Sequence, residues 1–336
     1  MKRTHYLLYF FALLSLLFSC SPGERKAFYE ADVSGIHIDS VQIIRYEEVL
    51  FEANPFILYQ ELEPYFDEFA FFLGEGIHDP MGQQQLYNYV TDPVLIDIYL
   101  DSREVYPDMQ ETQDALHDAF RFYRYHFPGS DLPRLYTFIS GIDWMMPIVY
   151  EDRHLAISID NYLGRDYPLY DKLGIPRYQS HWMRPESIPL DVMRTLAATR
   201  LAGIQRAPET LLEQMIHEGK KLYFLDCMFP RQADSLKIRY GERQMQWMHR
   251  NEEMVWLYIL DNELLYTSGH EAITRFVGDA PFTSIFSQDS APRTGTWIGW
   301  QIVREYMRRH PGLSLDELLL ETDAVKVLRG SRYRPR

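Results

Sequence analysis

The stretch "MIHEGKKLYFLD", residues 215–226, predicts a helix with one apolar side and one polar side. At about 100° per residue, His217 and Lys221 lie together, opposite the apolar side chains. The residues just before it, 207–210, contain a proline and a glutamate suited to a helix start. We therefore expect the helix to pack through Leu211, Leu212, Met215, Ile216, Leu222 and Tyr223, with its polar side facing a cleft or solvent.

The polar side carries most of a zinc-binding motif. In the HExxH pattern, two histidines one helical turn apart bind the metal, and the glutamate polarises the attacking water. His217 and Glu218 match the first ligand and the base, but Lys221 stands at the second ligand position. An ammonium group with an ordinary pKa of about 10.4 has no lone pair and repels Zn²⁺. We therefore predict no metal and no cofactor here, with Lys221 or Lys220 paired to Glu218 or to a carboxylate of the next helix.

That next helix is expected over residues 252–266, opened by Glu252 and Glu253. A glutamate there corresponds in position to the third ligand of some zinc peptidases, but an acidic pair at a helix N-terminus also suits the helix dipole. His217, Glu218, Lys221 and Glu252 thus form a candidate relic site with no assigned catalytic residue. The alternative is a metal-dependent peptidase or hydrolase that uses His217, Glu218 and an unrecognised ligand.

The first residues indicate export and lipid attachment. Lys2 and Arg3 precede an apolar run over residues 6–18, too short to span a bilayer of roughly 30 Å, which is typical of a signal peptide over residues 1–19. The following "LFSC" is similar to the lipobox of Bacteroidetes lipoproteins, and it predicts acylation of Cys20. We expect anchoring in the cell envelope, at the periplasmic face of the outer membrane.

The charge of the chain limits its partners. There are 34 basic and 48 acidic residues, giving a net charge of −14, which disfavours nucleic acid and anionic lipid headgroups. Membrane contact should therefore come from the lipid on Cys20, with no nucleic-acid partner. Once Cys20 is acylated, only Cys227 remains, so no intrachain disulfide is expected.

Hydrophobic periodicity predicts an α+β fold that is predominantly helical, with a small central sheet. Residues 20–34 look like a tether, and 35–336 like a single globular domain with a helical N-terminal half. Strand patterns occur at 36–43 and within 133–163. Helical patterns occur within 54–127, at 190–202 and 297–310, and after the capping-box residue Ser314.

Several ordered blocks along residues 41–336 resemble the GldB family of gliding motility lipoproteins. They include "VQIIRYEEVLF", "FPGSDLPRLYTFISGI", "HLAISIDNYLGRDYPLY", "RFVGDAPFTSIF", "APRTGTWIGWQIVREYM" and the terminal "SRYRPR". The resemblance implies a lipid-anchored envelope protein associated with gliding and, through that apparatus, with the other envelope proteins of type IX secretion. GldB-like chains are in turn similar to predicted zinc-dependent proteases with a histidine where this chain has Lys221. This implies a zincin-like domain in the C-terminal half that has lost its metal site and is non-catalytic.

Overall fold

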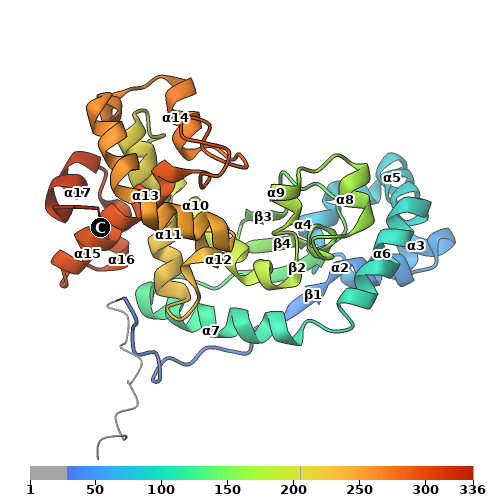
Figure 1. Cartoon of the computed structure of the whole chain (residues 1–336). Coiled ribbons are helices and arrows are strands. Elements are labelled where there is room, and N and C mark those ends of the chain that lie inside the picture. Colours follow the sequence, from blue (N-terminus) through green and yellow to red (C-terminus); the bar gives the residue numbers. More distant parts are fainter. Residues whose placement is uncertain (1–28, 205, 336) are drawn as a thin grey trace, which may run out of the picture.

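The computed structural model describes residues 29–204 and 206–335. Figure 1 shows a small sheet with short helices in one lobe and a bundle of longer helices in the other. The expectation of a mainly helical α+β fold with a small sheet is confirmed.

The sheet has four strands in the order β1-β2-β4-β3. Strand β1 (Ile43–Arg45) runs parallel to β2 (Arg134–Phe138), and β2 runs parallel to β4 (His154–Ser158). Strand β3 (Ile148–Glu151) closes the edge as an antiparallel hairpin with β4. The strand expected at 36–43 forms only from Ile43 onward, because the pairing of β1 with β2 begins at Ile43 opposite Leu135.

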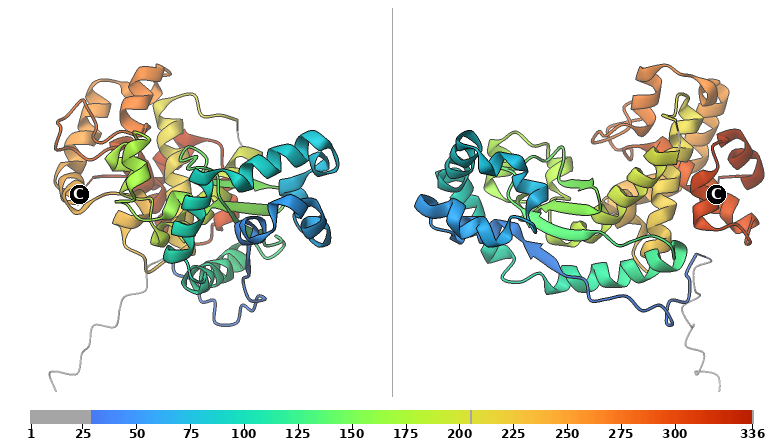
Figure 2. Two further views of the ribbon diagram at one scale, coloured as in Figure 1. Left: turned by 90° about the vertical axis from the view of Figure 1, so that its right-hand side faces the viewer. Right: turned by 180° about the vertical axis from the view of Figure 1, so that it is seen from behind.

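Helices of the N-terminal half surround this sheet. Asp79 and Asp92 accept backbone hydrogen bonds as N-caps of α5 and α6, each followed by a proline. The longest of these helices, α7, runs beneath both lobes (Figures 1 and 2). The bounds are α2 (Tyr46–Glu52), α3 (Leu58–Leu62), α4 (Ala70–Leu73), α5 (Pro80–Thr91), α6 (Pro93–Val105) and α7 (Gln110–His126).

The second half is almost entirely helical, and two predicted starts are corrected. Helix α11 begins at Leu211, where Thr210 and Glu213 form a capping box, so Pro208 and Glu209 precede it. Helix α13 begins at Glu242, so Glu252 lies inside the helix and not at its start. The bounds are α8 (Pro168–Lys172), α9 (Arg177–Ser180), α10 (Ile188–Ile204), α11 (Leu211–Met228), α12 (Asp234–Ile238), α13 (Glu242–Asp261), α14 (His270–Val277), α15 (Thr294–Arg309), α16 (Leu315–Leu320) and α17 (Ala324–Ser331).

Residues 29–34 lie against the domain. The ring of Tyr29 packs edge-on against Tyr223 of α11 with centroids 6.2 Å apart, and Arg121 of α7 donates to the carbonyls of Val33 and Ile36. Residues 29–34, expected as part of the tether over residues 20–34, therefore pack on the fold. The signal peptide and Cys20 fall outside the described residues.

No helix in the described part of the chain combines the length and apolar character needed to cross a membrane.

Candidate functional site

Helix α11 lies at the centre of the C-terminal bundle, and a close crossing with α15 fixes its rotation. A Cβ on Gly219 would lie 2.5 Å from the carbonyl carbon of Gly299, and a Cβ on Gly299 would lie 1.8 Å from the carbonyl oxygen of Met215. Both distances are too short for any side chain. The glycine within "HEGKK" therefore lets the two backbones touch, and it directs His217, Glu218 and Lys221 away from α15.

These three side chains occupy the half-buried face predicted from the helical pattern. The ammonium of Lys221 donates to Oε1 of Glu218 at 2.7 Å, with 19% of the lysine side chain and 31% of the glutamate side chain exposed. The positive charge thus lies next to the glutamate that corresponds to the base of the zinc motif. Of the pairings considered for Lys221, the structure contains the one with Glu218.

His217 lies beside this ion pair. Burial and the neighbouring Lys221 ammonium lower the pKa of His217 to about 4, so the imidazole is neutral at pH 7. Its Nδ1 is buried and has no hydrogen-bond partner within the protein. A neutral imidazole is the form that binds metals, but the adjacent ammonium opposes a cation at this position.

Lys220 points to the other side of α11 and has a different role. Its side chain is almost fully buried, and the ammonium donates to the backbone carbonyl of Glu321, just after α16. Burial lowers the pKa of Lys220 to about 8. The two lysines of the motif are therefore not equivalent, since Lys220 fastens α11 to the chain after α16 while Lys221 stays on the polar face.

Glu252 does not join this group. Its carboxylate accepts from the indole nitrogen of Trp297 at 2.9 Å and from the hydroxyl of Tyr333 at 2.7 Å. Across residues 29–204 and 206–335, no ion pair connects Lys221 with Glu252 or Glu253. Glu252 of the predicted relic site thus bonds to Trp297 of α15 and to Tyr333, and it holds the C-terminal tail against α13 and α15.

The polar face of α11 carries three groups, which are the imidazole of His217, the carboxylate of Glu218 and the ammonium of Lys221. Within the described residues, no three histidine, cysteine, aspartate or glutamate side chains are grouped so that they could hold a metal ion. Glu218 is paired with Lys221 at 2.7 Å, so the described residues present an ion pair on this face of α11.

A second charged group on α11, which the sequence did not reveal, is fully buried. Asp226 accepts from the ammonium of Lys237 at 2.8 Å, the indole of Trp300 at 2.8 Å and the guanidinium of Arg304 at 2.7 Å. Arg304 also donates two bonds to Asp234, both at 2.7 Å. Burial lowers the pKa of Arg304, but the hydrogen bonds and charges of Asp234 and Asp226 outweigh it and raise the pKa above the ordinary arginine value. The available sequence signal was an aspartate within the otherwise apolar run "LYFLDCM".

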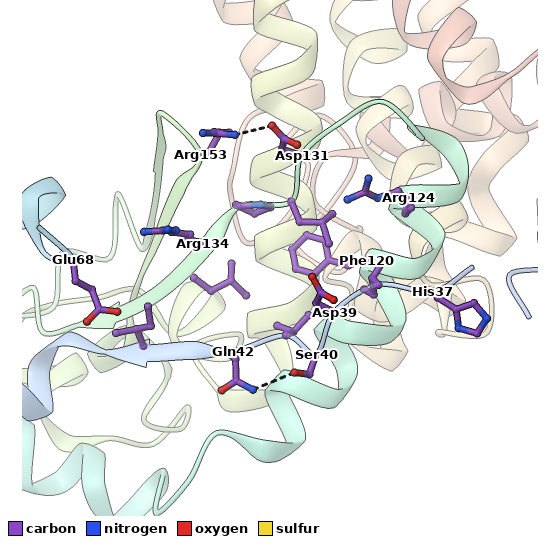
Figure 3. A pocket seen from close by; sticks show the side chains of 16 residues that line it. His37, Asp39, Ser40, Gln42, Glu68, Phe120, Arg124, Asp131, Arg134 and Arg153 are labelled. Atoms are coloured by element: carbon purple, nitrogen blue, oxygen red, sulfur yellow. Dashed lines mark hydrogen bonds and ion pairs between the residues drawn. The ribbon is translucent and has the colours of Figure 1, made fainter. Parts of the chain in front are cut away.

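A cavity of about 780 Å³ lies away from α11 (Figure 3). It is bounded by the chain just before β1, by helix α7 and by the first residues of β2. Its charges balance, with Arg124, Arg134 and Arg153 facing Asp39, Glu68 and Asp131. One pair, Arg153 with Asp131, is joined at 2.7 Å. The balance favours no class of charged ligand, and we assign none.

The fold and the site together define a mainly helical α+β protein with an ion pair on its central helix. The chain belongs to the family of the gliding motility protein GldB, whose model matches residues 26–335. Searches of curated proteins and of solved structures found no match. The family agrees with the resemblance seen in the sequence, and it connects the chain to gliding motility and to the cell envelope.

Proposed function

We propose that the protein is a lipid-anchored, non-catalytic component of the gliding and type IX secretion machinery, at the periplasmic face of the outer membrane. In this proposal Cys20 carries the lipid, and the globular domain contacts other envelope proteins. Helix α11 is the counterpart of the metal-binding helix of zincin-like proteases, with its metal function lost. Family membership supports the association with gliding.

The observation that carries the non-catalytic assignment is the position of the Lys221 ammonium. It lies one turn from His217, on the same face, and 2.7 Å from Glu218. Two like charges about 4 Å apart repel each other by several kcal/mol near a protein surface, and the repulsion doubles for a divalent ion. A bound Zn²⁺ at His217 would have to overcome this repulsion without a group of three ligands.

Metal analysis tests the assignment directly. We expect the full chain, purified in detergent and equilibrated with Zn²⁺, to retain no stoichiometric zinc after dialysis. Zinc bound at one ion per chain and lost in His217→Ala would favour the hydrolase alternative. The matched control is His270→Ala, because His270 begins an exposed helix and belongs to a second "HE" pair without further ligands.

A complementation experiment tests the role in the cell. In a strain that lacks the gene, we expect Glu218→Gln and His217→Gln to restore gliding and secretion of reporter proteins, since neither side chain performs chemistry. Cys20→Ala should fail at equal protein level, because the lipid anchor is lost. Failure of Glu218→Gln with normal protein abundance would contradict the non-catalytic role.

A further inference from the structure

Helix α13, the longest in the described part of the chain, is covered by the protein on one side only. Its buried side chains recur every three or four residues, and they are Met248, Glu252, Val255, Trp256 and Ile259. Through this side α13 packs on α15, where Glu252 accepts from the indole of Trp297. The opposite side carries exposed residues between Arg250 and Asp261, so it is a helix face without a partner among the described residues.

Four residues of the exposed side form one stripe. At about 100° per residue, Arg250, Met254, Leu257 and Asp261 point within about 60° of one another. Their spacing of four, three and four residues is that of the a and d positions, which form the seam between two packed helices. Met254 is 40% exposed and Leu257 is 46% exposed, and Leu260 beside the stripe is 39% exposed. The stripe therefore has the pattern of a helix–helix contact.

The two ends of the stripe carry opposite charges. Arg250 and Asp261 are both exposed, and neither forms an ion pair or a side-chain hydrogen bond with another described residue. Met254 and Leu257 lie three residues apart, and each charge lies four residues beyond one of them. About its midpoint, the stripe is thus symmetrical in its apolar residues and opposite in the sign of its charges.

This symmetry selects a second copy of the same stripe. When two α13 helices pack antiparallel about a two-fold axis through the midpoint, Met254 faces Leu257 of the other copy, and Arg250 faces Asp261 of the other copy. A closed two-fold contact needs such a self-complementary surface. A parallel pair instead sets Arg250 against Arg250. An antiparallel pair shifted so that Leu257 faces Leu257 sets Glu253 against Asp261, and like charges repel in both cases.

We propose that the protein forms a homodimer through this stripe, with the two α13 helices antiparallel. One helix from each copy buries less than the roughly 800 Å² per partner of a standard interface, and exposed ion pairs add little. The dimer is therefore weak in dilute solution. Lipid attachment at Cys20, as proposed above, places the copies on one membrane and raises their effective concentration.

Exchange of the two charges tests the pairing. We expect sedimentation velocity of the full chain in detergent to show a concentration-dependent shift from one copy to two. Arg250→Asp and Asp261→Arg should each weaken association at least about tenfold, because each places two like-charge pairs in the dimer. The double variant Arg250→Asp, Asp261→Arg should associate within about threefold of the wild type, since the same pairs form with exchanged signs. Arg308→Asp, at an exposed arginine of α15, is the matched control and should associate as the wild type does.

Mixed cysteine variants test the register. Positions 250 and 261 of different copies face each other in the dimer, whereas the two copies of position 250 lie about 16 Å apart along the helix axis, at about 1.5 Å per residue. A short thiol crosslinker should therefore link Arg250→Cys chains to Asp261→Cys chains, and it should link neither variant to itself. The parent chain, in which Cys227 is buried, supplies the blank.

A pair of leucine variants examines the apolar contact. Leu257→Asp should weaken association at least about tenfold, whereas Leu100→Asp, at an exposed leucine of α6, should leave it unchanged. Unaltered thermal unfolding of each variant shows that the fold is intact. The proposal is overturned if the wild type stays monomeric, if the double charge exchange fails to restore association, or if each cysteine variant links to itself as readily as to the other. Association that survives Leu257→Asp also overturns it. These outcomes are independent of gliding and of metal content.

Discussion

Two charged groups on α11 are held in opposite ways. On the polar face, Glu218 and Lys221 form one bond and are both partly exposed. Nearer the C-terminal end, Asp226 is fully buried and accepts four hydrogen bonds from Lys237, Trp300 and Arg304. The first pair joins neighbours within one helix, whereas the second group ties α11 to α12 and α15.

The difference separates a pair whose loss should cost little stability from a buried group on which the fold depends. An exposed pair within a helix contributes at most about 1 kcal/mol. A buried pair that loses one partner costs about 3–5 kcal/mol, because the other charge stays buried without compensation. Substitution of the Glu218–Lys221 pair should therefore leave the fold intact, whereas substitution of Asp226 should not.

The largest predicted effect breaks the buried group. Asp226→Asn should lower the free energy of unfolding by about 3–5 kcal/mol, since the Lys237 ammonium has no other carboxylate within the described ion pairs. Urea unfolding followed by circular dichroism measures this loss. Glu218→Gln is the matched control, and it should cost no more than about 1 kcal/mol. Equal losses in the two variants would contradict the comparison.

The next effect concerns Gly219, which lies between Glu218 and Lys221 in the chain. Gly219→Ala places a Cβ 2.5 Å from the backbone of Gly299, and it should destabilise the protein by about 1–3 kcal/mol through overpacking. Gly203→Ala in α10 is the control, because nothing lies within 4 Å of its added Cβ. That control should gain up to about 1 kcal/mol from helix propensity. A neutral Gly219→Ala would show that α11 and α15 separate easily.

The third effect is a pH dependence at the polar face. The pKa of His217 is lowered from 6.5 to about 4 in the folded protein. The unfolded chain therefore binds this proton first, and stability is lost as the pH falls from 6.5 toward 4. His217→Gln should reduce the acid-side slope of the unfolding free energy in that window, and it should leave the slope above pH 7 unchanged. His126, whose pKa is also lowered to about 4, supplies the comparison through His126→Gln. An unchanged slope in His217→Gln would place the imidazole in solvent.

The sequence predicted the helices with strong periodicity and the local pairs within them. Helix α11, the capping box of Ser314 with Glu317, and the neighbours Glu218 and Lys221 are all set by spacing within one or two turns. The start of α13 was missed because "ERQMQWMHRN" is polar, and its N-cap is Gly241 rather than a serine, threonine or aspartate.

Contacts between distant residues could not be predicted. Glu252 is hydrogen-bonded to Trp297 and Tyr333, which lie 45 and 81 residues away in the sequence. Asp226 is hydrogen-bonded to Arg304, which lies 78 residues away. Charge patterns at such separations have no fixed geometry until helices pack. The cavity of about 690 Å³ between α9, the turn after α12, the start of α13 and the loop before α15 shares this property, because its walls come from distant parts of the chain. For the same reason, the sequence did not reveal that Glu252 bonds to Trp297 and Tyr333.

The docking of Tyr29 against α11 limits how far the protein can reach. If Cys20 is lipidated as proposed, about nine residues connect the acyl anchor to Tyr29, and a fully extended chain of that length spans at most about 30 Å. The domain then samples a thin layer above the bilayer rather than the full depth of the periplasm. Partners that bind it must themselves be held near that membrane. A longer linker would lower the effective concentration of the domain for such partners.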